Sequence, residues 1–233
     1  FKDSIVDVSL LLEEERRKGK QILLEGAQGS GLDIDYGQYP FVTSSSCIAG
    51  GASIGAGIGP TRINNVIGIA KVYTTRVDGN QESPFPTQLY GEGEKLLRDC
   101  GNEFGATTGR PRRCGWLDLV HLRQSIRISG VEQLILTKLD VFDSLDEIKV
   151  CDSYIINEET TKEYPGTALR LRNAKPTYAT FPGWKGQSTQ GITEFDKLSS
   201  NAKKYIWFIG DRLGVDIMAI STGTERSHII MMN

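Results

Sequence analysis

Helical segments that precede short apolar strands constrain the fold of this chain more than any other feature. Residues 117–129 have a helical pattern that Gly130 ends, and an apolar strand over 132–137 follows at once. The same order returns near the C-terminus, where a helix over 196–213 precedes a strand over 215–220. Because helices that alternate with buried strands are typical of α/β domains, the sequence predicts an α/β fold.

The same patterns predict further elements along the chain. Residues 5–18 are amphipathic, and Gly19 ends that helix. The length of 233 residues fits one large α/β domain or two small ones. Besides the elements above, we predict helices over 5–18, from 49 onward and over 89–101, and strands over 21–24, 147–156 and 178–181. A helix-to-strand pattern over 63–76 ends in the segment 72–77, and polar or irregular segments are predicted over 78–84 and 157–175.

The composition excludes several classes of protein. A net charge of −2 gives no global basic field, so we do not expect a nucleic-acid partner. No apolar run approaches membrane-spanning length and no signal peptide is present, so we expect no membrane contact. The cysteines are far apart without a CxxC pair, which predicts reduced thiols in an intracellular protein and no zinc site.

A pair of threonines between glycines, followed by three arginines, stands out over residues 103–113. Glycines let the backbone turn and expose its N–H groups, and the hydroxyls of Thr107 and Thr108 add donors. Arg110 and Arg112 bring permanent charge in a forked geometry that matches carboxylate and phosphate. We predict an anion-binding loop, with a solvated basic turn as the alternative. The proline within the loop and the apolar run after it favour the anion site.

Two of the predicted strands end in polar residues that suit a purine. Lys138 and Asp140 follow the strand over 132–137, and α/β folds place ligand contacts at such strand ends. A carboxylate can accept hydrogen bonds from both guanine N1–H and the exocyclic amine, a pair that adenine does not offer. We predict that Asp140 reads guanine while Lys138 lies on the purine face. Ser221 and Gly223, after the strand over 215–220, would close the pocket; the alternative is Asp140 as a helix N-cap.

A glycine-rich loop over 26–31 follows the strand predicted over 21–24. The pattern GxxxxGK[ST] occurs nowhere in the chain, so this loop does not qualify as a P-loop. The amide of Gln28 can both donate and accept, as the edge of a nucleobase requires, whereas a glutamine that caps the loop backbone is the alternative. The hydroxyl-rich run over 43–46 fits either a phosphate site or a simple helix cap.

Taken in order, these motifs resemble the adenylosuccinate synthetase family, and the resemblance covers nearly the whole chain. It implies an α/β fold related to the P-loop NTPases, with a largely parallel central sheet, flanking helices and long ligand-facing loops. It also implies that residues 1–233 are the C-terminal part of a single domain, truncated at the N-terminus. The motifs are Gly26-Ala27-Gln28-Gly29, Leu32-Asp33-Ile34-Asp35, Tyr39-Pro40-Phe41-Val42-Thr43-Ser44-Ser45, Ala49-Gly50-Gly51, Thr74-Thr75-Arg76-Val77, Pro84-Phe85-Pro86-Thr87, the loop over 107–116, Thr137-Lys138-Leu139-Asp140, Pro182-Gly183-Trp184 and Ser221-Thr222-Gly223.

What the resemblance implies about activity is specific. The family joins IMP to L-aspartate at the expense of GTP, and it releases adenylosuccinate, GDP and phosphate. The reaction passes through 6-phosphoryl-IMP, uses Mg²⁺ and is the first committed step from IMP to AMP in purine biosynthesis. The family member is usually a homodimer in the cytoplasm. We therefore expect IMP, L-aspartate and GTP as ligands, with a second copy of the chain as a partner.

By motif match, the resemblance assigns a binding role to individual residues. Gln28 supports the reaction by holding the hypoxanthine base, and Val77 lines the ribose through its backbone. Arg110 contacts IMP and aspartate, and Arg112 contacts aspartate and the GTP side. We expect both arginines to face a cavity shared with Gln28. The implied sets are Gln28, Thr43, Val77 and Arg110 for IMP; Thr107, Thr108, Arg110 and Arg112 for aspartate; and Arg112, Lys138, Asp140, Ser221 and Gly223 for GTP.

Several family features have no counterpart in these 233 residues. They are the GDEGKGK loop, the catalytic aspartate and histidine, the Mg²⁺ contacts, and the arginine that reaches the IMP of the neighbouring subunit. The chain also begins at Phe1 rather than at a methionine. We therefore expect no catalytic residue and no metal ligand here, and an inactive chain by itself, because the base and the metal seat are missing. A non-catalytic guanine-nucleotide-binding module, or a scaffold, is the alternative.

Overall fold

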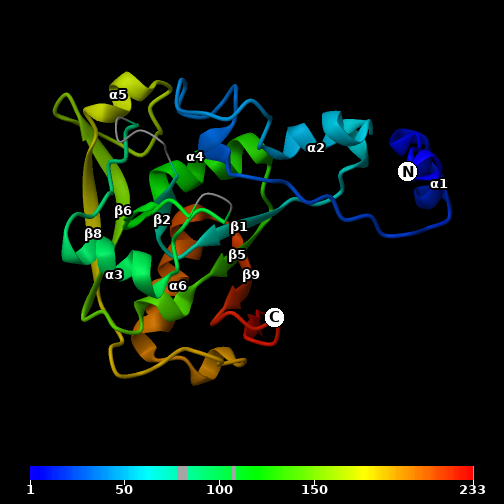
Figure 1. Cartoon of the computed structure of the whole chain (residues 1–233). Helices are drawn as coiled ribbons and strands as arrows, with labels where there is room; N and C mark the ends of the chain where they lie inside the picture. Colours follow the sequence, from blue (N-terminus) through cyan, green and yellow to red (C-terminus); the bar gives the residue numbers. More distant parts are fainter. Residues whose placement is uncertain (78–82, 107–108, 233) are drawn as a thin grey trace.

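The computed structural model describes residues 1–77, 83–106 and 109–232. A four-stranded sheet in the order β1-β5-β9-β10 lies at its centre (Figure 1). Strands β1, β5 and β9 run parallel, and β10 is antiparallel to β9. The predicted α/β fold with a largely parallel central sheet is therefore confirmed. The strands are β1 (Ile67–Lys71), β5 (Gln133–Thr137), β9 (Asp216–Ser221) and β10 (Ile229–Met231).

Two helices lead into the parallel strands, as the sequence predicts. Helix α4 (Leu119–Ser129) precedes β5, and helix α6 (Ser200–Leu213) precedes β9. Gly130 and Gly214 end these helices in the left-handed conformation, which glycine adopts without a steric penalty. Figure 1 shows both helices between the central sheet and a second sheet.

The second sheet is built around the long strand β6 (Glu147–Ile156), whose bounds are those that the sequence predicts. Strand β4 (Leu117–Asp118) pairs with β6 in parallel, and β7 (Glu159–Thr161) and β8 (Lys175–Pro182) pair with it in antiparallel fashion. A separate two-stranded sheet consists of β2 (Thr74–Arg76) and β3 (Arg113–Gly115). The short strands β3, β4 and β10 were not predicted, because two or three residues show no periodicity.

Aromatic side chains fill the core where the central sheet, α6 and β8 meet. Phe142 is fully buried, and its ring centroid lies 5.9 Å from those of Tyr73 and Tyr205. The ring centroids of Trp116 and Trp184 lie 6.2 and 6.1 Å from that of Phe142. Such ring pairs add to the free energy that the buried apolar area itself contributes. This core holds the strand ends β1 and β5, from which the candidate site is built, in fixed positions.

The remaining predicted elements are found with shifted bounds, with one exception. The helical part of the pattern predicted over 63–76 is wrong, because this range holds β1 and β2 and no helix. Most of the polar segment predicted over 78–84 lies outside the described residues. Helix α3 (Glu92–Cys100) lies within the predicted range 89–101, and the segment over 157–175 contains β7 and helix α5 (Ala168–Arg172). No helix in the described part of the chain is long and apolar enough to cross a bilayer. Short 3₁₀ turns occur at Lys2–Ser4, Ser30–Leu32, Pro60–Arg62, Leu139–Phe142 and Phe195–Lys197.

The N-terminal segment, residues 1–66, differs from the rest. It carries α1 (Val8–Arg17) and α2 (Ala49–Ala56), neither of which has a buried residue, and both lie away from the central sheet in Figure 1. The strand predicted over 21–24 is wrong: these residues belong to no helix or strand, and the Leu23 side chain is 88% exposed. A short apolar run becomes a strand only where another strand accepts its hydrogen bonds, and the structure supplies none there.

Candidate functional site

The carboxyl ends of three parallel strands define one edge of the central sheet. The register pairs Lys71 with Thr137, the last residues of β1 and β5. It also pairs Leu136 of β5 with Ile220 of β9, so Ser221 lies beside the end of β5. Because parallel neighbours end at the same edge, the structure brings the two predicted purine-binding loops, 138–140 and 221–223, next to each other.

Asp140 lies within the 3₁₀ turn Leu139–Phe142, whose N-cap residue is Lys138. The alternative of Asp140 as a helix N-cap is therefore wrong. Asp140 is half-buried and forms no ion pair within the described part of the chain. Burial, together with the nearby Asp143 carboxylate, raises the pKa of Asp140. The ionised form of a half-buried carboxylate is stabilised by any N–H donor that a ligand brings.

The loop after β9 is tightly folded around Gly223. The hydroxyl of Ser221 donates to the Gly223 carbonyl at 3.1 Å, and the Thr222 N–H donates to the His228 carbonyl at 3.0 Å. A Cβ atom on Gly223 would lie 2.5 Å from Nδ1 of His228, so only glycine fits here. His228 is half-buried against this loop.

The predicted anion loop forms a hairpin that is closed at its base by Glu103 and Arg112. The Arg112 N–H donates to the Glu103 carbonyl at 2.9 Å, and the Gly105 N–H donates to the Arg110 carbonyl at 2.9 Å. Arg110 is exposed toward the end of the hairpin, and Arg112 is half-buried at its base. The predicted residues Thr107 and Thr108 lie outside the residues that the structure describes.

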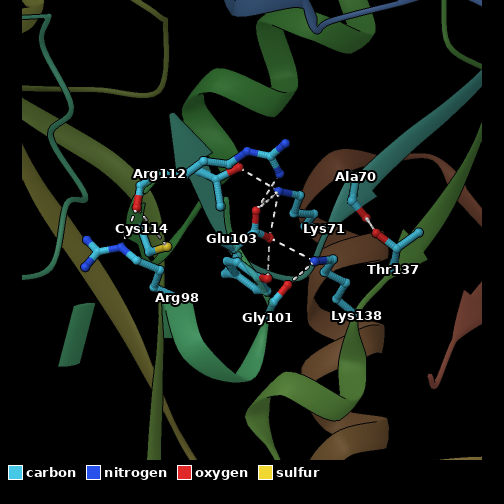
Figure 2. Close-up of polar contacts among 11 residues, drawn as sticks. Ala70, Lys71, Arg98, Gly101, Glu103, Arg112, Cys114, Thr137 and Lys138 are labelled. Atoms are coloured by element: carbon cyan, nitrogen blue, oxygen red, sulfur yellow. Dashed lines mark hydrogen bonds and ion pairs between the residues drawn. The ribbon is translucent and has the colours of Figure 1, made fainter. Parts of the chain in front are cut away.

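Glu103 is the centre of a cluster of charges that the sequence did not predict (Figure 2). Its fully buried carboxylate accepts from Lys71 Nζ at 2.8 Å, from the Tyr73 hydroxyl at 2.6 Å, and from Arg112 Nη1 at 2.7 Å. Lys138 Nζ lies 3.1 Å from the same carboxylate. Burial opposes ionisation, but the Lys71, Tyr73 and Arg112 hydrogen bonds outweigh it and lower the pKa of Glu103 to about 2.

This cluster, which we call the Glu103 cluster, joins two parts of the predicted site. Arg112 belongs to the anion hairpin, Lys138 follows β5, and Lys71 ends β1. Three cationic side chains surround a single carboxylate, so positive charge remains after pairing. Their side chains are about a quarter to a third exposed, which leaves them within reach of a ligand. An excess of partly exposed positive charge at strand ends can bind phosphate or carboxylate.

Gln28 and Thr43 lie in the N-terminal segment. The backbone of Gln28 has a φ of 61°, in the left-handed region that non-glycine residues seldom adopt, and its side chain is exposed. Cys47 Sγ lies 3.9 Å from Gln28 Oε1. The Thr43 N–H donates to the Leu32 carbonyl at 2.8 Å. These contacts fold the segment back on itself, so that Gln28 and the residues after Thr43 share one region.

Val77 follows β2 and is 42% exposed. The buried residue before it, Arg76, donates from Nη2 to the Phe41 carbonyl at 2.9 Å and from Nε to the Ser83 hydroxyl at 2.6 Å. Phe41 is two residues before Thr43, so Arg76 holds the Val77 backbone beside the Thr43 segment. The structure thus brings together two residues that the resemblance assigns to IMP.

Two small cavities are described, and neither is lined by Gln28, Arg110 or Arg112. The cavity that these three residues were expected to share therefore stays a prediction. One cavity of about 280 Å³ lies near β7 and α5, and the other, of about 40 Å³, lies where β2 meets the N-terminal segment. Within the described ranges, no group of three or more His, Cys, Asp or Glu side chains could hold a metal ion.

The sequence model of the adenylosuccinate synthetase family matches residues 1–230 of this chain. The chain belongs to the adenylosuccinate synthetase family. Its fold is accordingly the α/β, P-loop-type fold of that family, although the chain has no P-loop sequence of its own.

Adenylosuccinate synthetases from several bacteria are similar over almost the whole chain. The protein of Thermodesulfovibrio yellowstonii is 49% identical over 231 residues, which cover 99% of this chain and 53% of that relative. The protein of Thermosynechococcus vestitus is 50% identical and is matched over 51% of its own length. The chain therefore spans about half the length of the curated relatives that it matches.

A solved structure described as a fully ligated adenylosuccinate synthetase from Plasmodium falciparum superposes with a TM-score of 0.95 at 39% identity. The match covers 99% of this chain and 55% of that one. The synthetase-like arrangement therefore extends over all the elements described above, including the projecting N-terminal segment.

Proposed function

We propose that this chain is the substrate-binding part of a GTP-dependent ligase that joins IMP to L-aspartate to form adenylosuccinate, through 6-phosphoryl-IMP. The observation that carries this proposal is the Glu103 cluster. It ties the anion hairpin to the strand end that bears Lys138 and Asp140. An amino-acid site beside a purine-nucleotide site is the arrangement that such a ligase requires. Membership of the adenylosuccinate synthetase family supports the same reaction.

In this proposal, the guanine of GTP lies at the edge formed by β5 and β9. Asp140 accepts hydrogen bonds from the guanine N1–H and the exocyclic amine, and the loop with Ser221 and Gly223 closes over the base. The raised pKa and half-buried position of Asp140 support this role, because its carboxylate forms no ion pair with any residue that the structure describes. The aliphatic stem of Lys138 lies against the purine, since its ammonium is bound by Glu103.

The α-carboxylate of L-aspartate binds to the hairpin. Arg112 presents its guanidinium at the base of the hairpin, and the exposed Arg110 contacts both aspartate and IMP. Thr107 and Thr108 supply further donors in the same proposal. Fixed positive charge is suited to this task because guanidinium groups stay protonated next to phosphates.

IMP occupies the region between the N-terminal segment and β2. Gln28 holds the hypoxanthine base, Thr43 binds the phosphate, and the backbone of Val77 lines the ribose. The hydrogen bond from Arg76 to the Phe41 carbonyl supports this assignment, because it keeps the Thr43 and Val77 segments side by side.

Phosphoryl transfer itself needs groups that lie outside these 233 residues. Mg²⁺ would balance the charge of the transferred phosphoryl group. The described residues offer no cluster of ligands for it, so we assign it no seat here. We propose that the rest of the family's chain supplies the metal seat and the catalytic acid and base. We further propose that the complete enzyme is a cytoplasmic homodimer and that residues 1–233 are inactive by themselves.

The first test is an assay of the full-length protein with IMP, L-aspartate and GTP. We expect adenylosuccinate to form, and a protein that leaves IMP unchanged in the presence of GTP and Mg²⁺ would contradict the proposal. In the same assay, Arg110→Leu should raise the KM for aspartate by about tenfold or more, because a charge-assisted bond is lost. Unchanged aspartate kinetics would remove Arg110 from the aspartate site.

The second test addresses guanine recognition. Asp140→Asn should lower the ratio of kcat/KM for GTP to that for ATP by about tenfold to a hundredfold, since a charge-assisted pair contributes about 1.5–3 kcal/mol. Asp143→Asn is the matched control. Asp143 lies three residues away and binds Trp184, Ser188 and Thr189 instead, so its loss should leave the ratio unchanged. Equal effects of the two substitutions would contradict base reading by Asp140.

Calorimetric titration of residues 1–233 with GDP and with ADP separates the proposal from its alternatives. A guanine-binding module without catalysis would bind GDP in preference to ADP while the full-length protein makes no adenylosuccinate. A scaffold would bind neither nucleotide. The proposed enzyme requires both selective GDP binding at Asp140 and product formation by the full-length protein.

A further inference from the structure

The Glu103 cluster lies between two ligand sites and contains residues that neither site explains. Lys71 and Glu103 have no assigned role, yet they occupy the centre of the contacts drawn in Figure 2. We propose that Glu103 is a positioning residue that holds Arg112 and Lys138 in fixed places for aspartate and for guanine. This inference rests on the proposed function, because it takes the two ligand assignments from there.

The contacts of Lys138 show how Glu103 serves the proposed guanine site. Its backbone has a φ of 65°, in the left-handed region that costs a non-glycine residue free energy. Its ammonium donates to the Gly101 carbonyl and lies 3.1 Å from the Glu103 carboxylate. Glu103 therefore binds the charged end of Lys138 and leaves the aliphatic stem as the part that meets a ligand.

The contacts of Arg112 show how Glu103 serves the proposed aspartate site. Glu103 accepts from Arg112 Nη1 through its side chain and from the Arg112 N–H through its own carbonyl, at 2.7 and 2.9 Å. Arg98 Nε donates to the Arg112 carbonyl at 2.9 Å, which fixes the backbone from the other side. Arg112 Nη2 has no hydrogen-bond partner among the described residues, and the side chain is 26% exposed. The guanidinium is thus held along one edge and can donate along another.

The charge of Glu103 is what allows three cations to lie together. Lys71, Arg112 and Lys138 all approach the one carboxylate, and without it they would repel one another in a partly buried place. An amide in its place could still accept a hydrogen bond, but it would not offset the repulsion. The expected result of Glu103→Gln is that Arg112 and Lys138 move apart and that both ligand sites lose their geometry together.

A purely structural role for Glu103 makes a different prediction. Glu103 closes the base of the hairpin through its backbone, so general weakening of the hairpin would disturb every substrate, including IMP. If Glu103 instead positions Arg112 and Lys138, its loss should weaken the binding of aspartate and GTP and leave the binding of IMP largely unchanged. IMP provides the internal reference, because Gln28 and Thr43 make no contact with Glu103 in the structure.

The experiment is steady-state kinetics of Glu103→Gln in the full-length enzyme, with each substrate varied in turn. We expect the KM for L-aspartate and the KM for GTP each to rise about tenfold or more, and the KM for IMP to change by less than about threefold. Glu103→Asp keeps the charge but shortens the side chain by one methylene. It should show the same selective pattern at a smaller amplitude, and it serves as the test if Glu103→Gln does not fold.

Glu94→Gln is the matched control. Glu94 pairs with Arg98 at 2.9 Å under the same hairpin, so the substitution removes the same charge from a neighbouring, half-buried ion pair. It should raise no KM by more than about threefold. A Glu103 variant whose three KM values rise equally, or which behaves like the Glu94 variant, overturns the positioning role while the proposed function stands. If the wild-type enzyme forms no adenylosuccinate, both the proposed function and this inference are overturned.

Discussion

The N-terminal segment, residues 1–66, and the α/β body, residues 67–232, are stabilised in different ways. The body buries an aromatic and aliphatic core around Phe142. Neither helix of the N-terminal segment has a buried residue, and among the residues of 1–66 whose burial is described, the buried ones are the polar Asp33 and Gln38. Apolar burial therefore holds the body together, whereas hydrogen bonds of buried polar groups shape the segment and attach it.

Each region contains a buried carboxylate, and the two differ in the donors that they bind. Asp33 accepts four backbone N–H groups, those of Asp35, Tyr36, Cys47 and Ile48. Glu103 instead accepts from cationic side chains and a tyrosine. Backbone donors fold a local loop, while cationic side chains come from distant elements and join them. The first carboxylate organises its own segment, and the second organises the site.

The largest expected difference between the regions is the cost of removing an apolar side chain. Phe142→Ala should lower the free energy of unfolding by about 3–5 kcal/mol, because Phe142 is fully buried among four aromatic rings. Leu11→Ala in α1 should change it by less than about 0.5 kcal/mol, since Leu11 is 43% exposed. Denaturant unfolding followed by tryptophan fluorescence measures both. Similar costs would show that the segment has an apolar core of its own.

The second prediction concerns Asp118, a buried carboxylate beside the small cavity where the regions meet. Burial raises the pKa of Asp118 to about 6, against the hydrogen bond from Tyr154. Since the folded pKa lies above the unfolded value of 3.8, the proton binds more tightly to the folded state. Stability is then greatest below about pH 4 and is lost as pH rises through about 6, by about 3 kcal/mol at most.

Asp118→Asn should remove that loss. Urea unfolding of both proteins between pH 4 and pH 7 gives the slope of the unfolding free energy against pH for each. The difference between the two slopes isolates the contribution of Asp118 from that of other titrating groups. Asparagine remains a good N-cap for α4, so the helix start should be kept. Parallel pH profiles for the variant and the wild type would mean that Asp118 has an ordinary pKa in the folded protein.

The third prediction sharpens the role of Asp33. In the wild type, backbone N–H groups donate to the carboxylate oxygens of Asp33. Asp33→Asn places an NH₂ group opposite some of these donors, which should lower the free energy of unfolding by about 2 kcal/mol. Hydrogen exchange of the Cys47 and Ile48 amides, which Asp33 binds, should accelerate about tenfold or more. Amides of β5 serve as the control and should keep their protection. Acceleration throughout the body would show that the segment and the body unfold as one unit.

The pH dependence of this effect has a definite sign. Burial opposes ionisation of Asp33, but its four backbone hydrogen bonds prevail and lower its pKa. The contribution of the carboxylate is therefore present above the unfolded value of 3.8 and is lost as pH falls below it. The difference in exchange rate between the variant and the wild type should shrink in acid.

The last prediction, Tyr164→Phe, tests a single hydrogen bond between the two regions. The Tyr164 hydroxyl accepts a hydrogen bond from Gln38 of the N-terminal segment, and the ring packs against His121. Removing only the hydroxyl should cost about 1 kcal/mol, because the ring contact remains. Thermal unfolding at one pH is sufficient to measure this. A larger loss than that of Asp33→Asn would mean that this one hydrogen bond, rather than the Asp33 loop, attaches the segment.

The sequence predicts the body better than the segment, for a physical reason. Strands β5, β6 and β9 and helices α4 and α6 have strong periodicity and glycine stops, and the structure has them close to the expected bounds. Residues 21–24 have the same apolar character as a strand but no partner that accepts their hydrogen bonds. Local pattern determines whether a segment can become a strand, and tertiary pairing determines whether it does.

The candidate site was predicted in part. Lys138, Asp140 and Gly223 follow strands and Ser221 ends one, and the rule for strand ends is enough to place them at one edge of a parallel sheet. Glu103 was missed as a site residue. Its sequence position shows an acid at the start of a basic loop, whereas its role depends on Lys71 and Lys138, 32 and 35 positions away. Convergence of such distant residues is a property of the fold, and a single sequence without pairing information does not reveal it.

The most direct test of the proposed site is a crystal structure of the full-length protein with GDP and L-aspartate bound. We predict guanine N1–H and the exocyclic amine within about 3.2 Å of the Asp140 carboxylate, and the aspartate carboxylate on Arg110 and Arg112. Lys138 should still be bound to Glu103. A guanine bound elsewhere, with Asp140 in solvent and Arg112 turned away from aspartate, would contradict both the proposed function and the role of the Glu103 cluster.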